Sequence, residues 1–364
     1  MKKITAAFIL LLAIATTATA QMDLPPSGGN TRATITEEVG ITSITIKYSR
    51  PDVNGREGKI WGTLVTYGFT SQNLNTNKSD MPWRAGANET TMITFEHDVK
   101  VEGKDIKAGT YGLYMAVWAE KATIIFSKQA DAWGSFFYEE KNDVLRVDVK
   151  PVALDKSVEW LKYEFIEQRE KYCVIALQWE KLSIPFRVDV DVDNIVLARM
   201  REQVTGQRGF TPLLLTAAAN YFINKKINLE EALAWSQRAA SFKSFSTLNT
   251  LGTAYTQLNK LKEADSTMNE ALVFANVGQY LNYGRNLIVA KRLDRALEVF
   301  NASQKKNGDV FQVNAGFMSY YSAKGDFQKA LEYANKALAQ APEPQKAAVN
   351  TMIAKLKEGK DINQ

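Results

Sequence analysis

Four regularly spaced alanines in the carboxy-terminal half constrain the fold of this chain more than any other feature. They are 32, 32 and 34 residues apart: Ala232, Ala264, Ala296 and Ala330. A similar short segment precedes each of them: Leu229-Glu-Glu, Leu261-Lys-Glu, Leu293-Asp-Arg and Phe327-Gln-Lys. Such a period is typical of helical hairpins that stack as a solenoid, because each hairpin buries its apolar face against the next one. The pattern therefore predicts an all-α solenoid in this half of the chain.

The residues inside each repeat fit the close packing of two helices. They are Leu251, Gly252, Tyr255, Ala264, Met268 and Ala271 in the second repeat, Gly284, Ala296 and Phe300 in the third, and Gly316, Ala330, Ala337 and Pro342 in the fourth. Small residues let the two helices of a hairpin cross closely, and large residues fill the layer against the next hairpin. These spacings resemble tetratricopeptide repeats, and the resemblance implies about four hairpins over residues 210–342. The first repeat is looser, since Tyr221 to Ala232 is two residues longer than Tyr255 to Ala264.

The segments that flank the repeats are expected to be helical as well. The apolar period becomes helical after Asp193, so residues 192–209 predict a linker helix that breaks at Gly206 and Gly209. Residues 343–364 predict a capping helix, which begins near Pro344, and a short tail.

Stacked hairpins present an extended surface on which a peptide or a partner helix binds. The first helices of the second to fourth repeats offer these candidate contacts: Asn249, Thr253, Gln257, Arg285 and Ser319. The set lacks the basic and asparagine pattern that grips peptide carboxylates in chaperone-binding tetratricopeptide proteins, and the alternative is a solvated groove without a specific ligand. From residue 192 to 364 the chain has 22 basic and 15 acidic residues, a net charge of +7. This excess indicates either an ordinary solvated surface or a preference for an acidic partner.

The preceding half has the period-two pattern of β-strands. Candidate strands cover residues 33–36, 44–48, 91–95, 99–101, 111–118, 122–127, 144–149, 158–166, 172–179 and 182–190. These roughly nine or ten strands are joined by short connections without helix-length patterns, so parallel βαβ units are not expected. The pattern predicts an all-β sandwich, or a flattened barrel, over residues 31–191.

The least regular part of this half runs from Arg50 to Asn88. Long irregular segments inside a compact domain tend to be functional. Tryptophan supplies a stacking face and arginine a rigid fork of donors, a combination that suits a small polar ligand such as a sugar or a carboxylate. The candidate ligand-binding residues are Arg50, Trp83, Arg84, Asn88, Glu89 and Arg146. The alternative is structural: Trp83 plugs one end of the sandwich and Arg84 pairs with an acid.

Several motifs of this half together resemble one bacterial family. They are Tyr48-Ser-Arg-Pro51, Gly55-Arg56, Trp61-Gly62, Leu64-Val65, Tyr67-Gly68, Trp83-Arg84, Gly86-Ala-Asn-Glu89, Ile93-Thr-Phe95, Ala108-Gly-Thr-Tyr-Gly-Leu113, Trp133-Gly134 and Val144-Leu-Arg-Val147. The chain is similar, over roughly residues 31–190, to the domain of unknown function 2911, a family of exported bacterial proteins. The resemblance implies no activity. Between Gly68 and Trp83 this chain has a longer polar insertion than the family pattern.

The first twenty residues have the organisation of a signal peptide. Lys2 and Lys3 form a positive region, residues 6–15 are apolar, and Ala18-Thr-Ala20 supplies the small residues that a signal peptidase accepts. Cleavage after Ala20 would leave Gln21 at the start of a periplasmic or secreted protein. The apolar run is too short for a stable membrane span, and no later segment approaches one.

Catalytic and cofactor signatures are absent from the sequence. Cys173 is the only cysteine and His97 the only histidine, so neither an internal disulfide nor a multi-histidine metal site is expected. Removal of two lysines with the signal peptide lowers the net charge from +5 to +3, which is too weak to indicate nucleic-acid binding. A glycosidase would need a pair of carboxylates, and the candidates are Glu89, Glu96, Glu139 and Asp143. Their spacing in the sequence gives no support for such a pair.

These patterns favour an exported, non-enzymatic binding or scaffold protein without a cofactor or metal. The helical repeats are its expected arm for a protein or peptide partner, and the β domain is a possible module for a small polar ligand. The alternative is a hydrolase or another carbohydrate-acting β domain that uses Arg50, Trp83, Arg84, Asn88 and Glu89.

Overall fold

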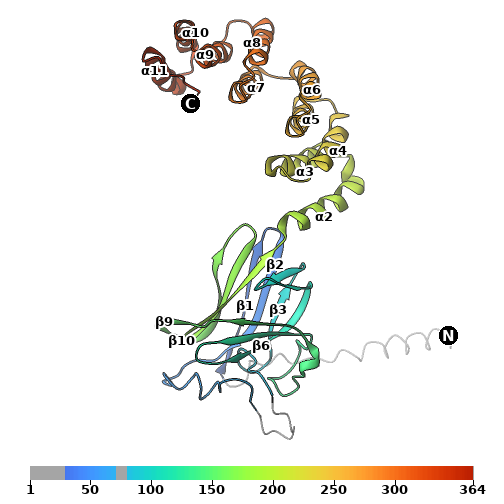
Figure 1. The fold of residues 1–364 in the computed structure, drawn as a ribbon, viewed down its shortest axis with the longest axis vertical. Coiled ribbons are helices and arrows are strands. Elements are labelled where there is room, and N and C mark those ends of the chain that lie inside the picture. Colours follow the sequence, from blue (N-terminus) through green and yellow to red (C-terminus); the bar gives the residue numbers. More distant parts are fainter. Residues whose placement is uncertain (1–28, 71–79, 364) are drawn as a thin grey trace, which may run out of the picture. The chain divides into compact units, whose positions relative to one another are not determined.

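The structure, a computed structural model, describes residues 29–70 and 80–363. The expected signal peptide, its cleavage site and most of the polar insertion between Gly68 and Trp83 lie outside the described residues. The chain divides into two compact units, Met1–Arg199 (the β unit) and Met200–Gln364 (the helical unit). Figure 1 shows strands in the first unit and helices in the second.

The β unit contains two antiparallel sheets. The six-stranded sheet has the order β1-β2-β3-β6-β7-β8 and the four-stranded sheet the order β5-β4-β10-β9. The strands are β1 (Thr31–Val39), β2 (Thr42–Arg50), β3 (Thr91–Phe95), β4 (Val99–Val101), β5 (Lys104–Ile106), β6 (Gly109–Val117), β7 (Ala122–Ser127), β8 (Asp143–Val149), β9 (Val152–Gln168) and β10 (Tyr172–Val190). All ladders between these strands are antiparallel, as the absence of helix-length connections predicts.

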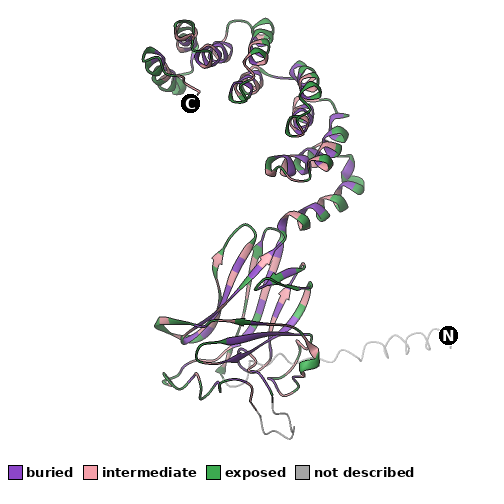
Figure 2. Cartoon of the chain, in the orientation of Figure 1, coloured by how far each residue is buried: buried purple, intermediate pink, exposed green. Residues whose placement is uncertain are grey.

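Alternating apolar side chains form the core of this unit. Ile44 and Ile46 of β2 are fully buried, while Thr45 between them forms a hydrogen bond with Thr36 of the neighbouring strand. Phe126 of β7 packs edge-on against Phe186 of β10, so aromatic rings join the two sheets. Figure 2 shows the same alternation of buried and less buried positions along the strands. This packing confirms the predicted all-β sandwich.

The observed strands differ from the predicted ones in their ends, since β1 and β9 begin earlier and end later than predicted, and also in two further respects. Residues 172–179 and 182–190 belong to one strand, β10, rather than two. The register of β10 against β9 shifts on either side of Glu180, which has a φ of 49°. A β-bulge of this kind interrupts the period-two pattern while the ladder continues. Strand β5, which pairs with β4 across the turn at Glu102 and Gly103, was not predicted because Ile106 is its only apolar residue.

Cys173 lies in β10 with its side chain fully buried. Burial, together with the negative charges of Glu37 and Asp189, raises the pKa of its thiol to about 12. The thiol therefore stays protonated at neutral pH, as expected for a small apolar core residue.

The helical unit consists of antiparallel helix pairs in a tetratricopeptide-like arrangement. Helix α2 (Val192–Thr205) crosses the division between the units. The pairs are α3 (Pro212–Lys225) with α4 (Leu229–Ala240), α5 (Phe245–Gln257) with α6 (Leu261–Val273), α7 (Val277–Val289) with α8 (Leu293–Asn307), and α9 (Phe311–Ala323) with α10 (Phe327–Gln340); α11 (Glu343–Lys357) follows. In Figure 1, α3, α5, α7 and α9 lie on the inner side of this curved row, and α4, α6, α8 and α10 lie on the outer side.

The repeated alanines occupy equivalent buried positions. Ala232, Ala264, Ala296 and Ala330 all lie near the start of the second helix of a pair, and each is at most 1% exposed. In the looser first repeat, both Lys226 and Asn228 adopt the left-handed conformation between α3 and α4. The connection itself has three residues, as in the other three pairs, so the first repeat differs in the conformation of this turn and not in its length. None of the described helices combines the length and the apolar character required to cross a membrane.

Candidate functional site

The structure does not bring all six predicted ligand-binding residues of the β unit together. Arg50 donates a hydrogen bond from Nε to the carbonyl oxygen of Leu161 on β9, at 2.9 Å. This contact joins the end of β2 to the other sheet. The guanidinium of Arg50 is therefore engaged in holding the two sheets together.

Trp83 belongs to a cluster of three tryptophans. Its ring stacks on Trp179 of β10 at 6.2 Å between centroids and meets Trp61 edge-on at 5.7 Å. The indole Nε1 of Trp83 donates to the carbonyl oxygen of Gly86 at 3.2 Å. The ring therefore fills space between the irregular segment and β10, which is the structural role considered for it from the sequence.

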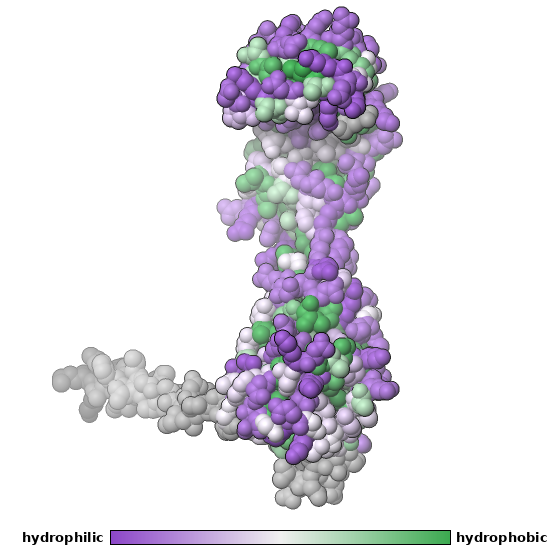
Figure 3. All heavy atoms as spheres, turned by 90° about the vertical axis from the view of Figure 1, so that its left-hand side faces the viewer, coloured by the Kyte–Doolittle hydropathy of each residue, from purple (hydrophilic) through white to green (hydrophobic). Residues whose placement is uncertain are grey.

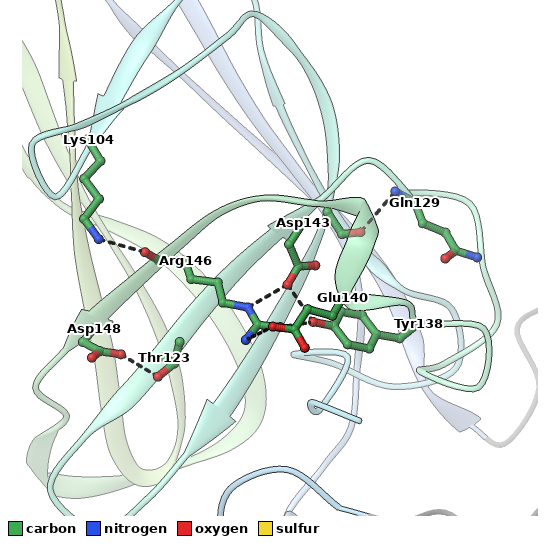
Figure 4. A network of polar contacts seen from close by, with 9 residues as sticks. Lys104, Thr123, Gln129, Tyr138, Glu140, Asp143, Arg146 and Asp148 are labelled. Atoms are coloured by element: carbon green, nitrogen blue, oxygen red, sulfur yellow. Dashed lines mark hydrogen bonds and ion pairs between the residues drawn. The ribbon is translucent and has the colours of Figure 1, made fainter. Parts of the chain in front are cut away.

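Arg146 of β8 is held in a separate polar network, shown in Figure 4. Its Nε donates to the carboxylate of Asp143 at 2.7 Å, and its terminal nitrogens contact Tyr138 at 2.6 Å and Glu140 at 3.2 Å. Burial raises the pKa of Asp143, although hydrogen bonds from Tyr138 and Arg146 act in the opposite direction. Burial and the hydrogen bond to Asp143 also raise the pKa of the Tyr138 hydroxyl.

Arg84, Asn88 and Glu89 lie at the end of the irregular segment. Asn88 has a φ of 56°, and its side-chain oxygen accepts a hydrogen bond from Asn30 at 3.2 Å. Arg84 is half-buried, and its Nε has no hydrogen-bond partner in the described part of the chain. Burial lowers the pKa of the Arg84 guanidinium, while the negative charge of Glu89 raises it.

Glu89 is the predicted residue that lines a pocket. Its carboxylate forms an ion pair with Arg32 of β1 and accepts a hydrogen bond from the hydroxyl of Ser49, at 2.9 Å. Burial raises the pKa of Glu89, but hydrogen bonds from its own backbone amide, Arg32 and Ser49 outweigh burial and lower the pKa overall. The carboxylate is therefore ionised at neutral pH.

The cavity beside Glu89, here called the Glu89 pocket, has a volume of about 410 Å³. Its charged and aromatic lining residues are Arg32, Lys47, Tyr48, Glu89, Asp131 and Trp133. A volume of this size lies within the range of about 300–1,000 Å³ that is usual for small-molecule sites. Glu89 was among the candidate residues predicted from the sequence, whereas Arg32 and Trp133 were not. Trp133 carried a detectable signal, because Trp133-Gly134 is one of the family-like motifs.

The hydrolase alternative receives no specific support from this geometry. A glycosidase needs a proton-donating carboxyl group with a raised pKa, whereas the pKa of Glu89 is lowered. Asp143 has a raised pKa, but it lies in the Arg146 network and does not line the Glu89 pocket. His97 is hydrogen-bonded to Thr42 at 3.1 Å, and the described residues contain no group of His, Cys, Asp or Glu side chains suited to a metal ion.

Arg285 is the most unusual of the candidate contacts in the helical unit. It lies on the inner helix α7 and is partly buried, and burial lowers the pKa of its guanidinium. Its Nε donates a long hydrogen bond to the hydroxyl of Ser319 on α9, at 3.4 Å. Among the residues that the structure describes, no carboxylate pairs with Arg285.

Ser319 itself is covered by the tail that follows α11. Asn363 donates a hydrogen bond to the carbonyl oxygen of Ser319 at 2.9 Å, and the hydroxyl of Ser322 donates to Asp361 at 2.7 Å. Only 2% of Ser319 is exposed. Ser319 therefore supports Arg285 and is not open to a partner in this conformation.

The remaining groove candidates lie on α5. Thr253 is hydrogen-bonded within the helix to the carbonyl oxygen of Asn249, at 2.8 Å, while Gln257 is exposed. The visible face of each unit is mainly hydrophilic, with apolar patches between the polar residues, as Figure 3 shows.

Comparisons with known proteins found a family model for the β unit and solved structures similar to the helical part. Residues 30–188 match the family described as "Protein of unknown function (DUF2911)", which confirms the resemblance seen in the motifs of this half. The helical part is similar to a tetratricopeptide repeat protein from Parabacteroides merdae, with 18% identity over 46% of this chain and 68% of that chain and a TM-score of 0.32. It is also similar to YrrB, described as a tetratricopeptide repeat protein with an unusual peptide-binding site, with 18% identity over 45% of this chain and 86% of that chain and a TM-score of 0.30. No curated protein matches the chain.

Proposed function

We propose that this chain is an exported, non-enzymatic binding protein whose helical unit engages a protein partner and whose β unit binds a small polar ligand. The features of residues 1–20 support export to the periplasm or the cell exterior. The observation that carries the proposed partner binding is Arg285, a partly buried guanidinium without an acidic partner among the described residues.

The proposal rests on the unfavourable free energy of burying part of the Arg285 guanidinium. Removing a charged group from water is unfavourable unless an opposite charge or several hydrogen bonds compensate for it. The single 3.4 Å contact with Ser319 is too long to supply that compensation. A carboxylate from a partner would complete the site with a charge-assisted hydrogen bond.

Other arginines of the helical unit provide an internal comparison. Arg292 pairs with Asp265, and Arg295 pairs with Glu298 at 2.6 Å. Arg238 donates to the carbonyl oxygens of Val204 and Gly209, at 3.1 and 2.9 Å. Each of these three guanidinium groups thus has a carboxylate or carbonyl partner within the fold, although the Nε of Arg295 makes no hydrogen bond, whereas the described part of the helical unit supplies Arg285 with the Ser319 contact and no carboxylate.

The chemistry points to a partner segment that contains aspartate or glutamate. The net charge of +7 over residues 192–364 favours the approach of such a segment. Helices α3, α5 and α7 follow one another on the inner side of the curved row, and Arg285 of α7 would recognise one carboxylate there. We therefore expect binding of an acidic peptide and weak binding of its uncharged counterpart.

An array of ten-residue peptides, each paired with an analogue that has Asn or Gln in place of Asp or Glu, tests this proposal. The full mature chain, residues 21–364, should bind a subset of acidic peptides at least tenfold more tightly than their analogues. Arg285→Gln should abolish this preference, whereas Lys291→Gln, which removes an exposed charge after the same helix, should retain it. Equal binding of acidic and uncharged peptides would refute the proposed partner chemistry.

Export is tested independently by fractionating bacterial cells that express the full chain. Mass spectrometry of the periplasmic or secreted protein should find Gln21 as its first residue. Deletion of residues 2–20 should retain the protein in the cytoplasm, and an unprocessed full-length protein in every fraction would contradict the expected cleavage after Ala20.

A further inference from the structure

Glu89 and Trp133 lie opposite one another in a short antiparallel bridge outside the main strands. The amide of Gly134 donates to the carbonyl oxygen of Asn88 at 2.9 Å, and the amide of Thr90 donates to the carbonyl oxygen of Ala132 at 2.9 Å. These flanking bonds make Glu89 and Trp133 a non-hydrogen-bonded pair, the kind in which opposed side chains lie closest together and on the same face. The backbone therefore sets a carboxylate beside an indole ring.

Both side chains line the Glu89 pocket, and the indole remains accessible. Trp133 is 49% exposed even though it borders a cavity of about 410 Å³. By contrast, the tryptophan cluster of the same unit contains Trp179, which is only 1% exposed. An accessible tryptophan at the edge of a pocket provides a flat apolar surface for a ligand.

The charged residues of the pocket restrict the charge of that ligand. Arg32 and Lys47 carry positive charges, and Glu89 and Asp131 carry negative charges, so the lining is neutral overall. An anionic ligand would be attracted by the two bases and repelled by the two carboxylates, and the reverse holds for a cationic ligand, so neither gains a net charge attraction. The lining therefore favours a ligand that is neutral but rich in hydrogen-bonding groups.

The ion pair between Arg32 and Glu89 supplies donors and acceptors next to each other. The ionised carboxylate of Glu89 only accepts hydrogen bonds, and the guanidinium of Arg32 only donates them. A pair of neighbouring hydroxyl groups can satisfy both, since each hydroxyl donates and accepts. A pyranose combines such hydroxyl groups with an apolar ring face that can pack on an indole.

We propose that the Glu89 pocket binds a neutral carbohydrate. The ring of the sugar stacks on Trp133, and its hydroxyl groups contact Glu89 and Arg32. This inference specifies the ligand of the β unit in the proposed function, and it does not depend on partner binding at Arg285. The expected site is then the pocket that contains Glu89 and no longer the full set of six candidate residues.

A glycan array with neutral, anionic and amine-bearing saccharides tests the ligand class with the full mature chain. Binders are then titrated by following tryptophan fluorescence and isothermal heats. Neutral saccharides should bind, and Trp133→Ala and Arg32→Met should each weaken their binding at least tenfold. Phe137→Ala, which truncates another exposed aromatic residue of the same loop outside the pocket, should leave binding unchanged.

The outcomes separate this inference from the others. Exclusive binding of anionic or amine-bearing saccharides, or the absence of any binder on the array, would overturn the carbohydrate assignment. Unchanged affinity in both Trp133→Ala and Arg32→Met would overturn the assignment to this pocket, provided that both variants show the circular dichroism of the parent. Arg285→Gln should leave sugar binding intact, so failure at the peptide site and failure at the sugar site are distinguishable.

Discussion

Gly284 of helix α7 lies so close to Phe300 of helix α8 that a Cβ atom at Gly284 would be 2.3 Å from the phenyl ring. Gly316 of α9 also lies against this ring, since a Cβ atom there would be 2.6 Å from the same side chain. Phe300 is only 1% exposed. The two glycines, one from each of two successive repeats, thus create the space for a single aromatic residue.

This contact predicts that Gly284→Ala destabilises the helical unit. Alanine normally stabilises a helix by up to about 1 kcal/mol relative to glycine, but the clash with Phe300 adds an overpacking cost of roughly 1–3 kcal/mol. We expect a net loss of about 1–2 kcal/mol in the free energy of unfolding, measured by urea denaturation. Gly278→Ala is the control, because it lies in the first turn of the same helix without a close neighbour. Equal unfolding midpoints for the two variants would contradict the packing argument.

Replacement of Arg285 should show whether the stability of the fold requires its positive charge. Arg285→Leu removes a desolvated guanidinium that lacks an acidic partner, so the free energy of unfolding should stay unchanged or rise. Arg292→Leu leaves Asp265 without one of its partners and should lower the free energy of unfolding. Thermal denaturation of both variants checks the opposite signs. A marked loss of stability in Arg285→Leu would mean that the fold itself requires this charge.

The lowered pKa of Glu89 predicts a specific dependence of stability on pH. Glutamate in the unfolded chain titrates near pH 4.3, whereas Glu89 in the folded protein titrates lower. Between these two values the unfolded state binds more protons, so this contribution is complete above pH 4.3 and is lost as the pH falls through the folded pKa. Glu89→Gln should therefore be less stable than the parent at pH 7, and the difference should shrink below about pH 4.

Unfolding curves from pH 3 to pH 7 measure this difference. Glu38→Gln, which changes an exposed glutamate on β1 outside the Glu89 pocket, is the matched control for the loss of one carboxylate. If the stability difference between Glu89→Gln and the parent did not change with pH, the ion pair with Arg32 would not stabilise the folded state.

Cys173 should be inert in the folded protein. Because burial raises its pKa to about 12, almost no thiolate is present at pH 8. A chromogenic disulfide reagent should therefore leave the native protein unmodified and should titrate one thiol per chain in denaturant. Rapid modification in native buffer would mean that β10 opens locally.

The packing of the helical half could be predicted from the sequence in more detail than that of the β half. In the helical unit, Gly284, Phe300 and Gly316 lie within one repeat length of each other, so local periodicity already specifies their packing. In the β unit, alternation identified most strands but not their exact ends, because the bulge at Glu180 breaks the pattern while β10 continues. Strand β5 has a single apolar residue, Ile106, and therefore shows no alternation, unlike the equally short β4.

The residues of the proposed binding sites were harder to predict from the sequence than the fold. Trp83 and Arg50 looked like ligand contacts because of their residue types, yet Trp83 packs against Trp179 and Arg50 binds the backbone of Leu161. Arg32 was not predicted as a ligand contact because it is a single basic residue on an edge strand. It joins the site only because the fold pairs it with Glu89, which is 57 residues away.

The amino-acid sequence by itself determined the β-then-α organisation, the repeat spacing, the single thiol and the charge excess of the helical half, because these depend on local composition and period. The tertiary structure decided that Arg32, Glu89 and Trp133 share one pocket and that Arg285 has no acidic partner among the described residues. Those properties arise from strand pairing and helix packing between distant segments, and the burial that gives a charge its energetic importance exists only after these segments have come together.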